Sequence, residues 1–528
     1  MKAFATLLES LVFTPSRNGK LRHIQDYVAR TPDPHRGWAL AALAGTLELP
    51  TAKPAMIRDL VTARVDAELF ALSYDYVGDL AETCALIWPG TGEAEAPTLG
   101  KVVDTLHAAG RSEVPDLLGG WMDALDPAGR WALLKLITGG LRVGVSARLA
   151  KTALADGHGK GLDEIEEMWH GLEPPYQALF AWLEGRADKP EIASLATFRP
   201  FMLAHPLGDG EVLDLDAYMV EWKWDGIRVQ LSGRDGTRRL YSRSGDDISA
   251  AFPDVLETMD VDAVLDGELL VRAPDGDVAP FNDLQQRLNR KTVGRPLMAR
   301  FPAFVRAYDL LFEGSEDLRT QPFAVRRQRL EHLFDRGVSP RLDLSEMIEA
   351  ASWDDLEHIR STRRHPGIEG VMLKRRDSAY VAGRPKGAWY KWKRDPLRAD
   401  VVLMYAQRGH GKRSSYYSDF TFGAWRDDEL VPVGKAYFGF TDAELAGLDR
   451  WVRNHTINRF GPVREVEKSL VLEVAFDSIH PSRRHKSGVA MRFPRIKRIR
   501  SDKPAYEADR LESLSAMIQG AGNPDAAT

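Results

Sequence analysis

Glu221-Trp222-Lys223-Trp224-Asp225-Gly226-Ile227-Arg228 is the stretch of sequence that decides the fold. Its alternation predicts a β-strand with Glu221, Lys223 and Asp225 on one face and the two tryptophans on the other. An ordinary lysine, with a pKa near ~10.4, stays protonated at neutral pH. Burial, neighbouring cations or a metal can remove that proton and make Lys223 a nucleophile. Alternatively, Lys223 forms an ion pair with Glu221 or Asp225.

Charged residues recur inside further apolar, strand-like segments along the chain. Asp266 and Glu268 interrupt a hydrophobic run at 265–270. A buried carboxylate is costly unless a cation or hydrogen bonds compensate it. This run therefore indicates a functional use of the carboxylates. The other segments of this kind are 241–245, 304–311, 367–374, 389–393 and 491–503.

In order and spacing, these segments resemble the six collinear motifs of the covalent nucleotidyltransferases, and they are most similar to those of ATP-dependent DNA ligases. The resemblance covers roughly residues 196–505. Arg492-Phe493-Pro494-Arg495 and Phe201-Met202-Leu203-Ala204 are typical of the DNA ligase branch rather than of the mRNA capping branch. The resemblance implies an enzyme that uses ATP to seal nicks in duplex DNA during replication, repair or recombination.

The resemblance also implies a chemical role for individual residues. Lys223 would attack the α-phosphate of ATP and hold AMP as a phosphoramidate. The adenylate would pass to a DNA 5′-phosphate, and a 3′-OH would then displace AMP. Lys391 and Lys393 would neutralise the α-phosphate. Glu268 and Glu369 would bind Mg²⁺, or Mn²⁺ in its place, because such ions prefer oxygen ligands.

Five more residues are expected around the nucleotide. The resemblance implies that Tyr308 stacks on adenine and that Glu221 contacts the adenine edge through its backbone. Arg228 and Arg243 would hold ribose or the DNA 5′-phosphate, and Lys374 belongs to the same ATP-binding set. Taken without the family, Tyr308 is equally well explained as a core aromatic residue.

Two points stay open at this stage. Glu268 is also compatible with a purely structural ion pair. Strict alternation puts Glu369 and Lys374 on opposite faces of a strand, whereas the family pattern directs both at the nucleotide. We therefore expect a bulge or a strong twist there.

The last motif lies far from Lys223 in the sequence and in a different predicted domain. The resemblance implies that Arg492, Arg500, Asp502 and Lys503 reach the pyrophosphate only when that domain closes over ATP. The domain would then swing away to admit DNA. Arg492 and Lys503 are on this basis predicted to be catalytic.

Length and composition indicate an intracellular multidomain enzyme. A chain of 528 residues predicts three or four domains, and a hydrophobic content of 44% is ample for packed cores. The single cysteine, Cys84, excludes an internal disulfide and a four-cysteine zinc module of the kind found in NAD-dependent ligases. No apolar run is long enough to span a bilayer, so we expect a cytoplasmic or nucleoid-associated protein without a membrane partner. We also expect it to be a monomer in solution.

Secondary-structure patterns divide the chain into three predicted domains. Residues 1–195 are typical of helices and resemble the DNA-binding domain of the larger ATP-dependent ligases. Residues 196–395 consist mainly of short strands, which predicts a mixed α+β nucleotidyltransferase domain with antiparallel sheets. Residues 396–528 combine strands with one helix, which favours a C-terminal OB-fold β-barrel.

Local signals mark several element boundaries. Helices are expected to be interrupted at Gly139-Gly140 and at Gly157-His158-Gly159. A hairpin is expected to turn at 234–236. The spacing of Thr441 and Glu444 predicts a capping box. The polar tail after about Leu514 is expected to fray.

The net charge of −5 conceals two strongly basic stretches. Residues 363–413 contain 14 bases and four acids, and residues 483–503 contain nine bases and one acid. Such density suits phosphate contacts and a salt-sensitive affinity. Glycines at 140–144 would also let the backbone approach phosphates. The residues expected to contact DNA are Arg142, Gly144, Arg243, Lys412 and Arg413.

Two other functions are compatible with parts of the pattern. An RNA ligase or a GTP-using capping guanylyltransferase would share the motifs, and sealing of nicked DNA with ATP but not GTP separates them. A non-catalytic DNA-end-binding protein of the same fold would bind nicks without adenylation.

Overall fold

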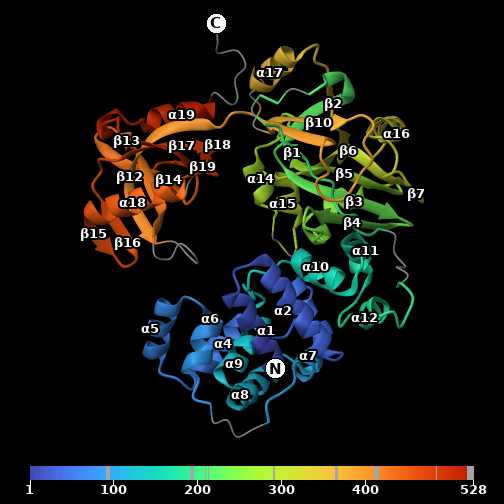
Figure 1. The fold of residues 1–528 in the computed structure, drawn as a ribbon, viewed down its shortest axis with the longest axis vertical. Coiled ribbons are helices and arrows are strands. Elements are labelled where there is room, and N and C mark those ends of the chain that lie inside the picture. The colour runs from blue at the N-terminus through green and yellow to red at the C-terminus, as the bar shows by residue number, and fades with distance from the viewer. Residues whose placement is uncertain are drawn as a thin grey trace.

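The computed structural model consists of three bodies (Figure 1). A helical N-terminal region lies at the bottom of this view, and two sheet-rich regions lie above it. None of the described helices has both the length and the apolar character needed to cross a membrane. The structure describes residues 1–90, 95–190, 196–208, 210–211, 213–288, 290, 292–362, 365, 367–408, 416–482 and 485–519.

The N-terminal region is built from amphipathic helices around one core. Helix α1 (Lys2–Phe13) is typical, because it buries Phe4, Leu7, Leu8 and Leu11 at helical spacing. The remaining helices are α2 (Arg17–Arg30), α3 (His35–Ala44), α4 (Pro54–Thr62), α5 (Ala67–Val77), α6 (Leu80–Ile87), α7 (Leu99–Ala108), α8 (Val114–Ala124), α9 (Pro127–Thr138), α10 (Ala147–His158), α11 (Leu162–Met168) and α12 (Gln177–Leu183).

One of the two predicted helix interruptions is placed correctly and the other is not. Helix α9 ends at Gly139, whose φ of 69° suits a glycine. The break predicted at 157–159 is wrong for its first two residues, because Gly157 and His158 form the last turn of α10. That helix ends at Gly159, which is left-handed with φ 63°.

Two mainly antiparallel sheets form the central region. One has the order β1-β11-β10-β2-β9, and the other has the order β4-β3-β5-β6-β7, with β8 beside β6. Only the β1–β11 and β6–β8 pairings are parallel among the described strands of these sheets. The strands are β1 (His205–Pro206), β2 (Tyr218–Trp224), β3 (Ile227–Arg234), β4 (Thr237–Ser242), β5 (Ala263–Val271), β6 (Ala303–Glu313), β7 (Glu316–Asp317), β8 (Leu342–Leu344), β9 (Met347–Ile348), β10 (Ile368–Arg375) and β11 (Trp389–Lys393).

Short helices cover these sheets. They are α13 (Pro253–Glu257), α14 (Phe281–Gln285), α15 (Arg295–Arg300), α16 (Phe323–Asp335) and α17 (Trp353–Thr362). The predicted hairpin is confirmed between β3 and β4. Its turn residues Asp235 and Gly236 both have positive φ, 47° and 77°, as a two-residue turn of this kind requires.

The C-terminal region is an antiparallel seven-stranded sheet with two helices. Strand β12 is central, and it pairs with β13, β16 and β17. A separate hairpin joins β18 and β19. The elements are β12 (Leu397–Arg408), β13 (Tyr417–Arg426), β14 (Glu429–Ala436), α18 (Asp442–Asn454), β15 (Thr456–Phe460), β16 (Val463–Val466), β17 (Val471–Phe476), β18 (Ser478–Pro481), β19 (Val489–Arg492), β20 (Arg495–Arg500) and α19 (Leu511–Gln519).

One C-terminal prediction is confirmed and another is wrong. Thr441 and Glu444 form the predicted capping box at the start of α18. The chain does not fray after Leu514, because helix α19 continues to Gln519 and Leu514 is fully buried in the core of this region. Residues 520–528 lie outside the described part of the chain.

Candidate active site

Lys223 lies on β2, which pairs with β10 and with the edge strand β9 in the five-stranded sheet. Its face is shared with Glu221, and Trp222 packs on the opposite face with Val220, as the alternation predicts. The lysine does not pair with either carboxylate proposed from the sequence. Instead its amine donates a hydrogen bond to Glu369 Oε2 at 2.5 Å.

A bulge brings Glu369 to the face of Lys223. The register of β10 against β2 shifts between Ile368 and Gly370, where the sequence required an irregularity. Gly370 makes the bulge possible, because a Cβ there would lie 2.2 Å from the carbonyl oxygen of Trp392. The bulge therefore allows both Glu369 and Lys374 to point at the site.

Three carboxylates surround the amine of Lys223. Burial raises the pKa of Glu268, on β5 of the other sheet, to about 8, and Lys223 opposes that rise. Burial and the neighbouring Glu369 also raise the pKa of Asp225. Burial alone would do the same to Glu369, but Lys223 and Lys393 outweigh it and lower its pKa. The site therefore lies between the two sheets. Its lysines do not fully neutralise the negative charge of the buried carboxylates.

A cluster of cations lies beside the carboxylates. Burial lowers the pKa of Lys391, and so do Lys223, Arg384, Lys393 and Arg243 around it. Among the described residues, no carboxylate forms an ion pair with the Lys391 ammonium. Such an excess of positive charge is suited to an anion. Arg243 is itself exposed, and Arg384 was not singled out from the sequence.

Glu221 and Lys374 form a buried ion pair beneath the site. They are 2% and 1% exposed, and their charged atoms lie 2.5 Å apart. The Lys374 ammonium also lies 4.2 Å from the centre of the Tyr308 ring. The side chain of Tyr308 is 9% exposed. The predicted roles of these three residues in binding the nucleotide stay predictions.

Arg228 is held by a partner that sequence reasoning missed. Asp266 on β5 accepts from its Nε and Nη2 at 3.0 and 2.6 Å. The hydroxyl of Tyr380 donates to the same carboxylate at 2.7 Å. Asp266 and Tyr380 therefore fix the position of the Arg228 guanidinium. The carboxylate inside an apolar run was the signal for Asp266.

The C-terminal region reaches the site through one hairpin. Arg492, the last residue of β19, forms an ion pair with Asp225. Asp477, directly before β18, lies 3.6 Å from Lys393 and 2.8 Å from Arg495. These contacts join the two sheet-rich regions beside Lys223.

The rest of the last motif is not brought to Lys223 in this arrangement. Arg500 and Lys503 both donate to Asp400 within the C-terminal region, at 3.0 and 2.8 Å. Arg500 also pairs with Asp502. The predicted contact of these residues with pyrophosphate stays a prediction, and it requires them to leave Asp400.

A divalent cation would find only part of its ligand set in this site. No group of three or more candidate ligands has metal-binding geometry among the residues that the structure describes. Mg²⁺ commonly takes only one or two protein carboxylates, together with water and substrate phosphates. Glu268 and Glu369 fit that need, because the raised pKa of Glu268 indicates that added positive charge would stabilise its carboxylate.

Comparisons with known proteins agree with this chemistry. The ATP dependent DNA ligase domain matches residues 201–393, and the ATP dependent DNA ligase C terminal region matches residues 413–503. A probable DNA ligase of Koribacter versatilis is 31% identical over 98% of this chain and 96% of its own. DNA ligase 1 of Korarchaeum cryptofilum is 30% identical over 98% of each chain. The chain belongs to the ATP-dependent DNA ligase family. A solved structure named Pmar-Lig_PreS3 shares the fold of this ligase, with a TM-score of 0.56 over 94% of this chain and 99% of that chain, at 16% identity.

Of the DNA-contact residues predicted for the ligase, Arg243 lies in the cation cluster around Lys391. The others lie apart from Lys223 or outside the described chain. Arg142 and Gly144 lie between α9 and α10 in the helical region, where both have positive φ. Lys412 and Arg413 fall outside the described residues. Their contacts with DNA remain predictions.

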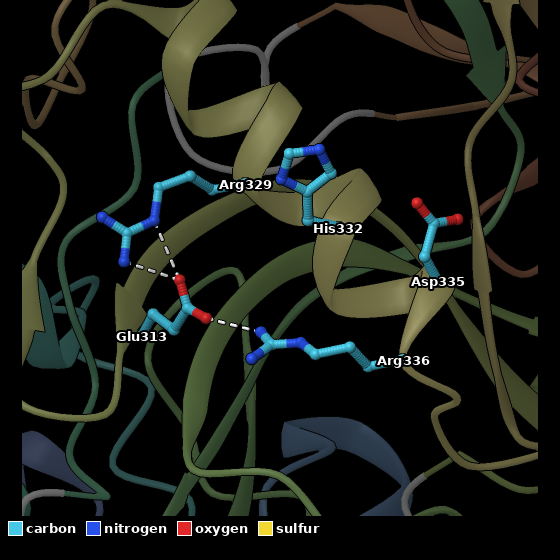
Figure 2. Close-up of a pocket in the computed structure, with 5 residues that line it drawn as sticks. All are labelled: Glu313, Arg329, His332, Asp335 and Arg336. Atoms are coloured by element: carbon cyan, nitrogen blue, oxygen red, sulfur yellow. Dashed lines mark hydrogen bonds and ion pairs between the residues drawn. The ribbon is translucent and has the colours of Figure 1, made fainter.

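A hollow beside α16 does not resemble a nucleotide site. Figure 2 shows Glu313 between Arg329 and Arg336, with His332 and Asp335 on the same helical segment. Glu313 is ion-paired with both arginines at 2.7 and 2.6 Å. The Glu313 carboxylate of this hollow is therefore paired with two arginines, whereas no described carboxylate forms an ion pair with the Lys391 ammonium.

Proposed function

We propose that this ligase seals nicks in duplex DNA, with ATP as the AMP donor and Lys223 as the residue that holds AMP. The observation that carries the proposal is the position of the Lys223 amine. It lies between a carboxylate cluster that suits a divalent cation and a cation cluster around Lys391 that suits phosphate.

In the first step, the neutral amine of Lys223 attacks the α-phosphorus of ATP. A P–N bond forms as the bond to the bridging oxygen breaks, and pyrophosphate leaves. The proton of the amine passes to water by way of Glu369, which is 2.5 Å away. Lys391 and Lys393 stabilise the negative charge that builds up on the phosphorus oxygens. Glu268 and Glu369 would hold a Mg²⁺ ion, which would supply further stabilisation of phosphate charge.

Two more transfers complete the reaction. A 5′-phosphate oxygen of the nick attacks the same phosphorus, the P–N bond breaks, and Lys223 regains its proton. The 3′-OH then attacks the 5′-phosphate and its proton passes to water. The new phosphodiester forms as the phosphoanhydride bond to AMP breaks, and AMP leaves. Arg243, which is exposed beside Lys391, and Arg228, which Asp266 fixes, would hold the ribose or the DNA 5′-phosphate.

The proposal includes a domain organisation. Residues 1–195 would bind DNA, and residues 196–395 would carry the nucleotidyltransferase site. Residues 396–528 would form an OB-fold that closes over ATP and then moves away. The protein would act as a monomer. Separate hydrophobic cores in the three parts support these boundaries. The antiparallel sheet around β12, with α18 inserted between its strands, supports the OB-fold.

Labelling with ATP tests the covalent step. The protein is incubated with α-labelled ATP and Mg²⁺, and the protein-bound label should survive alkali and be released by acid, as a phosphoramidate requires. Lys223→Ala should take no label, whereas Lys386→Ala, an exposed lysine of the same region, should take a normal amount. Label that persists in Lys223→Ala would defeat the proposal.

Sealing assays on defined nicked substrates test the specificity for DNA and for ATP. We expect sealing of nicked duplex DNA with ATP and not with GTP. Preference for nicked RNA, or use of GTP, would indicate the other nucleotidyltransferase classes. Binding of nicks without any label would indicate a non-catalytic DNA-end-binding protein.

A further inference from the structure

One histidine of the helical region reaches the strand that leads into Arg243. His170 lies in the short 3₁₀ helix η1 (Trp169–Gly171), directly after α11. The centre of its ring lies 4.5 Å from that of Tyr241, near the end of β4, and 6.2 Å from that of Phe198. Figure 1 accordingly shows α11 next to β4. The helical region therefore packs against the base of the segment that carries Arg243.

Arg243 lies in a closed turn that begins at the end of β4. The amide of Ser242 donates to the carbonyl oxygen of Asp246 at 2.8 Å, and the amide of Gly245 donates to that of Ser242 at 2.9 Å. Gly245 is buried, whereas Arg243 is exposed. Among the residues that the structure describes, Arg243 has no carboxylate partner. The backbone of the turn therefore sets the position of its guanidinium.

His170 holds the buried end of this turn. Its imidazole donates a hydrogen bond to the backbone of Gly245. Its Nε2 atom is buried and has no hydrogen-bond partner among the described residues, so Nδ1 is the donor. Gly245 has a φ of 84°, and a Cβ there would lie 3.1 Å from the Phe198 ring. The imidazole and Phe198 therefore both contact the same glycine.

Packing alone does not explain a histidine at this place. Burial, followed by the charge of Lys151, lowers its pKa to about 4, although Asp247 and Asp246 act in the opposite direction. The ring is therefore neutral at neutral pH, with one N–H and one lone pair. A buried polar atom without a partner costs about 1–3 kcal/mol. A phenylalanine would fill the space without that cost but could not bond to Gly245.

The position of η1 is itself fixed on two sides. Glu167 in α11 forms an ion pair with Arg319 of the nucleotidyltransferase region, at 2.5 Å. Glu166 forms a buried pair with Lys151 of α10 at 3.7 Å, and both are 2% exposed. The Lys151 ammonium also lies 5.4 Å from the centre of the Trp169 ring. His170 therefore extends from a rigid part of the helical region.

We propose that His170 is a positioning residue for Arg243, because it holds the Gly245 end of the turn that directs the guanidinium toward Lys391. The inference rests on the proposed function, in which Arg243 holds the ribose or the DNA 5′-phosphate. A displacement of about 1 Å in a group that positions the substrate slows a reaction by up to about 100-fold. The helical region thus contributes to the geometry of the reaction through one hydrogen bond.

Single-turnover kinetics of the full chain test this role. Self-adenylation and sealing of a pre-adenylated nick are measured separately, and Arg243→Gln shows which of the two rates depends on the guanidinium. His170→Phe keeps a ring against Tyr241 but loses the bond to Gly245. It should slow the two steps in the same proportion as Arg243→Gln, by about 10-fold in the more affected step. No loss of rate, or a loss confined to the other step, would overturn the proposal.

A conservative variant and a matched histidine separate positioning from packing. His170→Asn places an amide N–H close to the position of Nδ1 and should restore most of the rate. His158→Phe changes a half-buried histidine of α10 whose ring bonds to Leu154 in the same helix, and it should leave both steps unchanged. In the Arg243→Gln background, His170→Phe should cause no further loss, because both changes remove one interaction. A full additional loss in that background would overturn the proposal.

Hydrogen exchange tests the positioning without any activity. The amides of Ser242 and Gly245, which close the turn, should exchange about 5-fold faster in His170→Phe than in wild type, at an unchanged midpoint of thermal unfolding. Unchanged protection of these two amides would overturn the proposal. Uptake of α-labelled ATP is measured on the same preparations. Wild-type protein that takes no label would refute the proposed function, whereas faster exchange in His170→Phe would still show that His170 holds the turn.

Discussion

Replacing Lys374 with methionine should destabilise the central region far more than a surface substitution does. Lys374 and Glu221 are 1% and 2% exposed, and their charges lie 2.5 Å apart. Removing one member of a buried pair leaves the other charge uncompensated, which costs about 3–5 kcal/mol. In a region of this size, such a loss lowers the midpoint of thermal unfolding by roughly 6–20 °C.

The pH dependence of that loss identifies its cause. Burial already raises the pKa of Glu221, and loss of Lys374 should raise it further. A carboxyl group whose folded pKa exceeds its unfolded value of ~4.3 costs stability above that value. Lys374→Met should therefore regain stability as the pH falls toward that unfolded value, because Glu221 then takes up a proton.

Calorimetry on matched variants provides the measurement. The double variant Glu221→Gln, Lys374→Met should recover about 2 kcal/mol or more, since both charges are gone. Lys386→Met, at an exposed lysine of the same region, is the control. A shift no larger than that of Lys386→Met, or one that does not change with pH, would refute the reasoning.

Four further predictions concern catalysis and stability. Arg492→Gln should slow self-adenylation by at least about 10-fold, because the ion pair of Arg492 with Asp225 lies beside the nucleophile. Sealing of a pre-adenylated nick should be impaired less. An equal loss of rate in both steps would contradict this role of Arg492. Glu369→Gln should reduce labelling about 100-fold and raise the Mg²⁺ concentration needed, and an unchanged Mg²⁺ titration would contradict its role. Tyr380→Phe removes a hydrogen bond to a buried carboxylate, so kcat/KM for ATP should fall about 10-fold; unaltered ATP kinetics would argue that Arg228 needs no support. The hydrogen bond from Arg36 lowers the pKa of Glu184 from 4.5 to about 2, so its contribution to stability is present above pH 4.5 and is lost as the pH falls toward 2. Unfolding of Arg36→Gln between these pH values should show a shallower dependence than wild type, and parallel curves would contradict this.

Sequence alone could predict features that depend on residues close together in the chain. Alternation placed Glu221 and Lys223 on one face, and the Thr441 capping box located a helix start, because both patterns depend on nearby residues. An irregular strand was also predictable, because simple alternation cannot direct both Glu369 and Lys374 at one site. That this irregularity is a bulge follows from Gly370. The need for glycine there depends on the Trp392 carbonyl oxygen, which belongs to a different strand.

Contacts between distant segments could not be predicted in this way. The partner of Lys223 proved to be Glu369 rather than its sequence neighbours, since a bulge in another strand decides it. Asp266 beneath Arg228 and Arg384 beside Lys391 depend on how strands pair and loops fold back. The tail beyond Leu514 forms a helix because that leucine is buried against the C-terminal sheet, whereas local polarity suggested fraying.

The lone thiol of the chain is well placed for single-molecule work. Cys84 is fully buried in α6, and burial raises the pKa of its thiol to about 12. Thiolate, the form that maleimide dyes attack, is then scarce at neutral pH. Cysteines introduced at exposed sites can therefore carry fluorophores without prior removal of the native residue. Energy transfer between two such dyes would report how far apart the three bodies stand while the enzyme works.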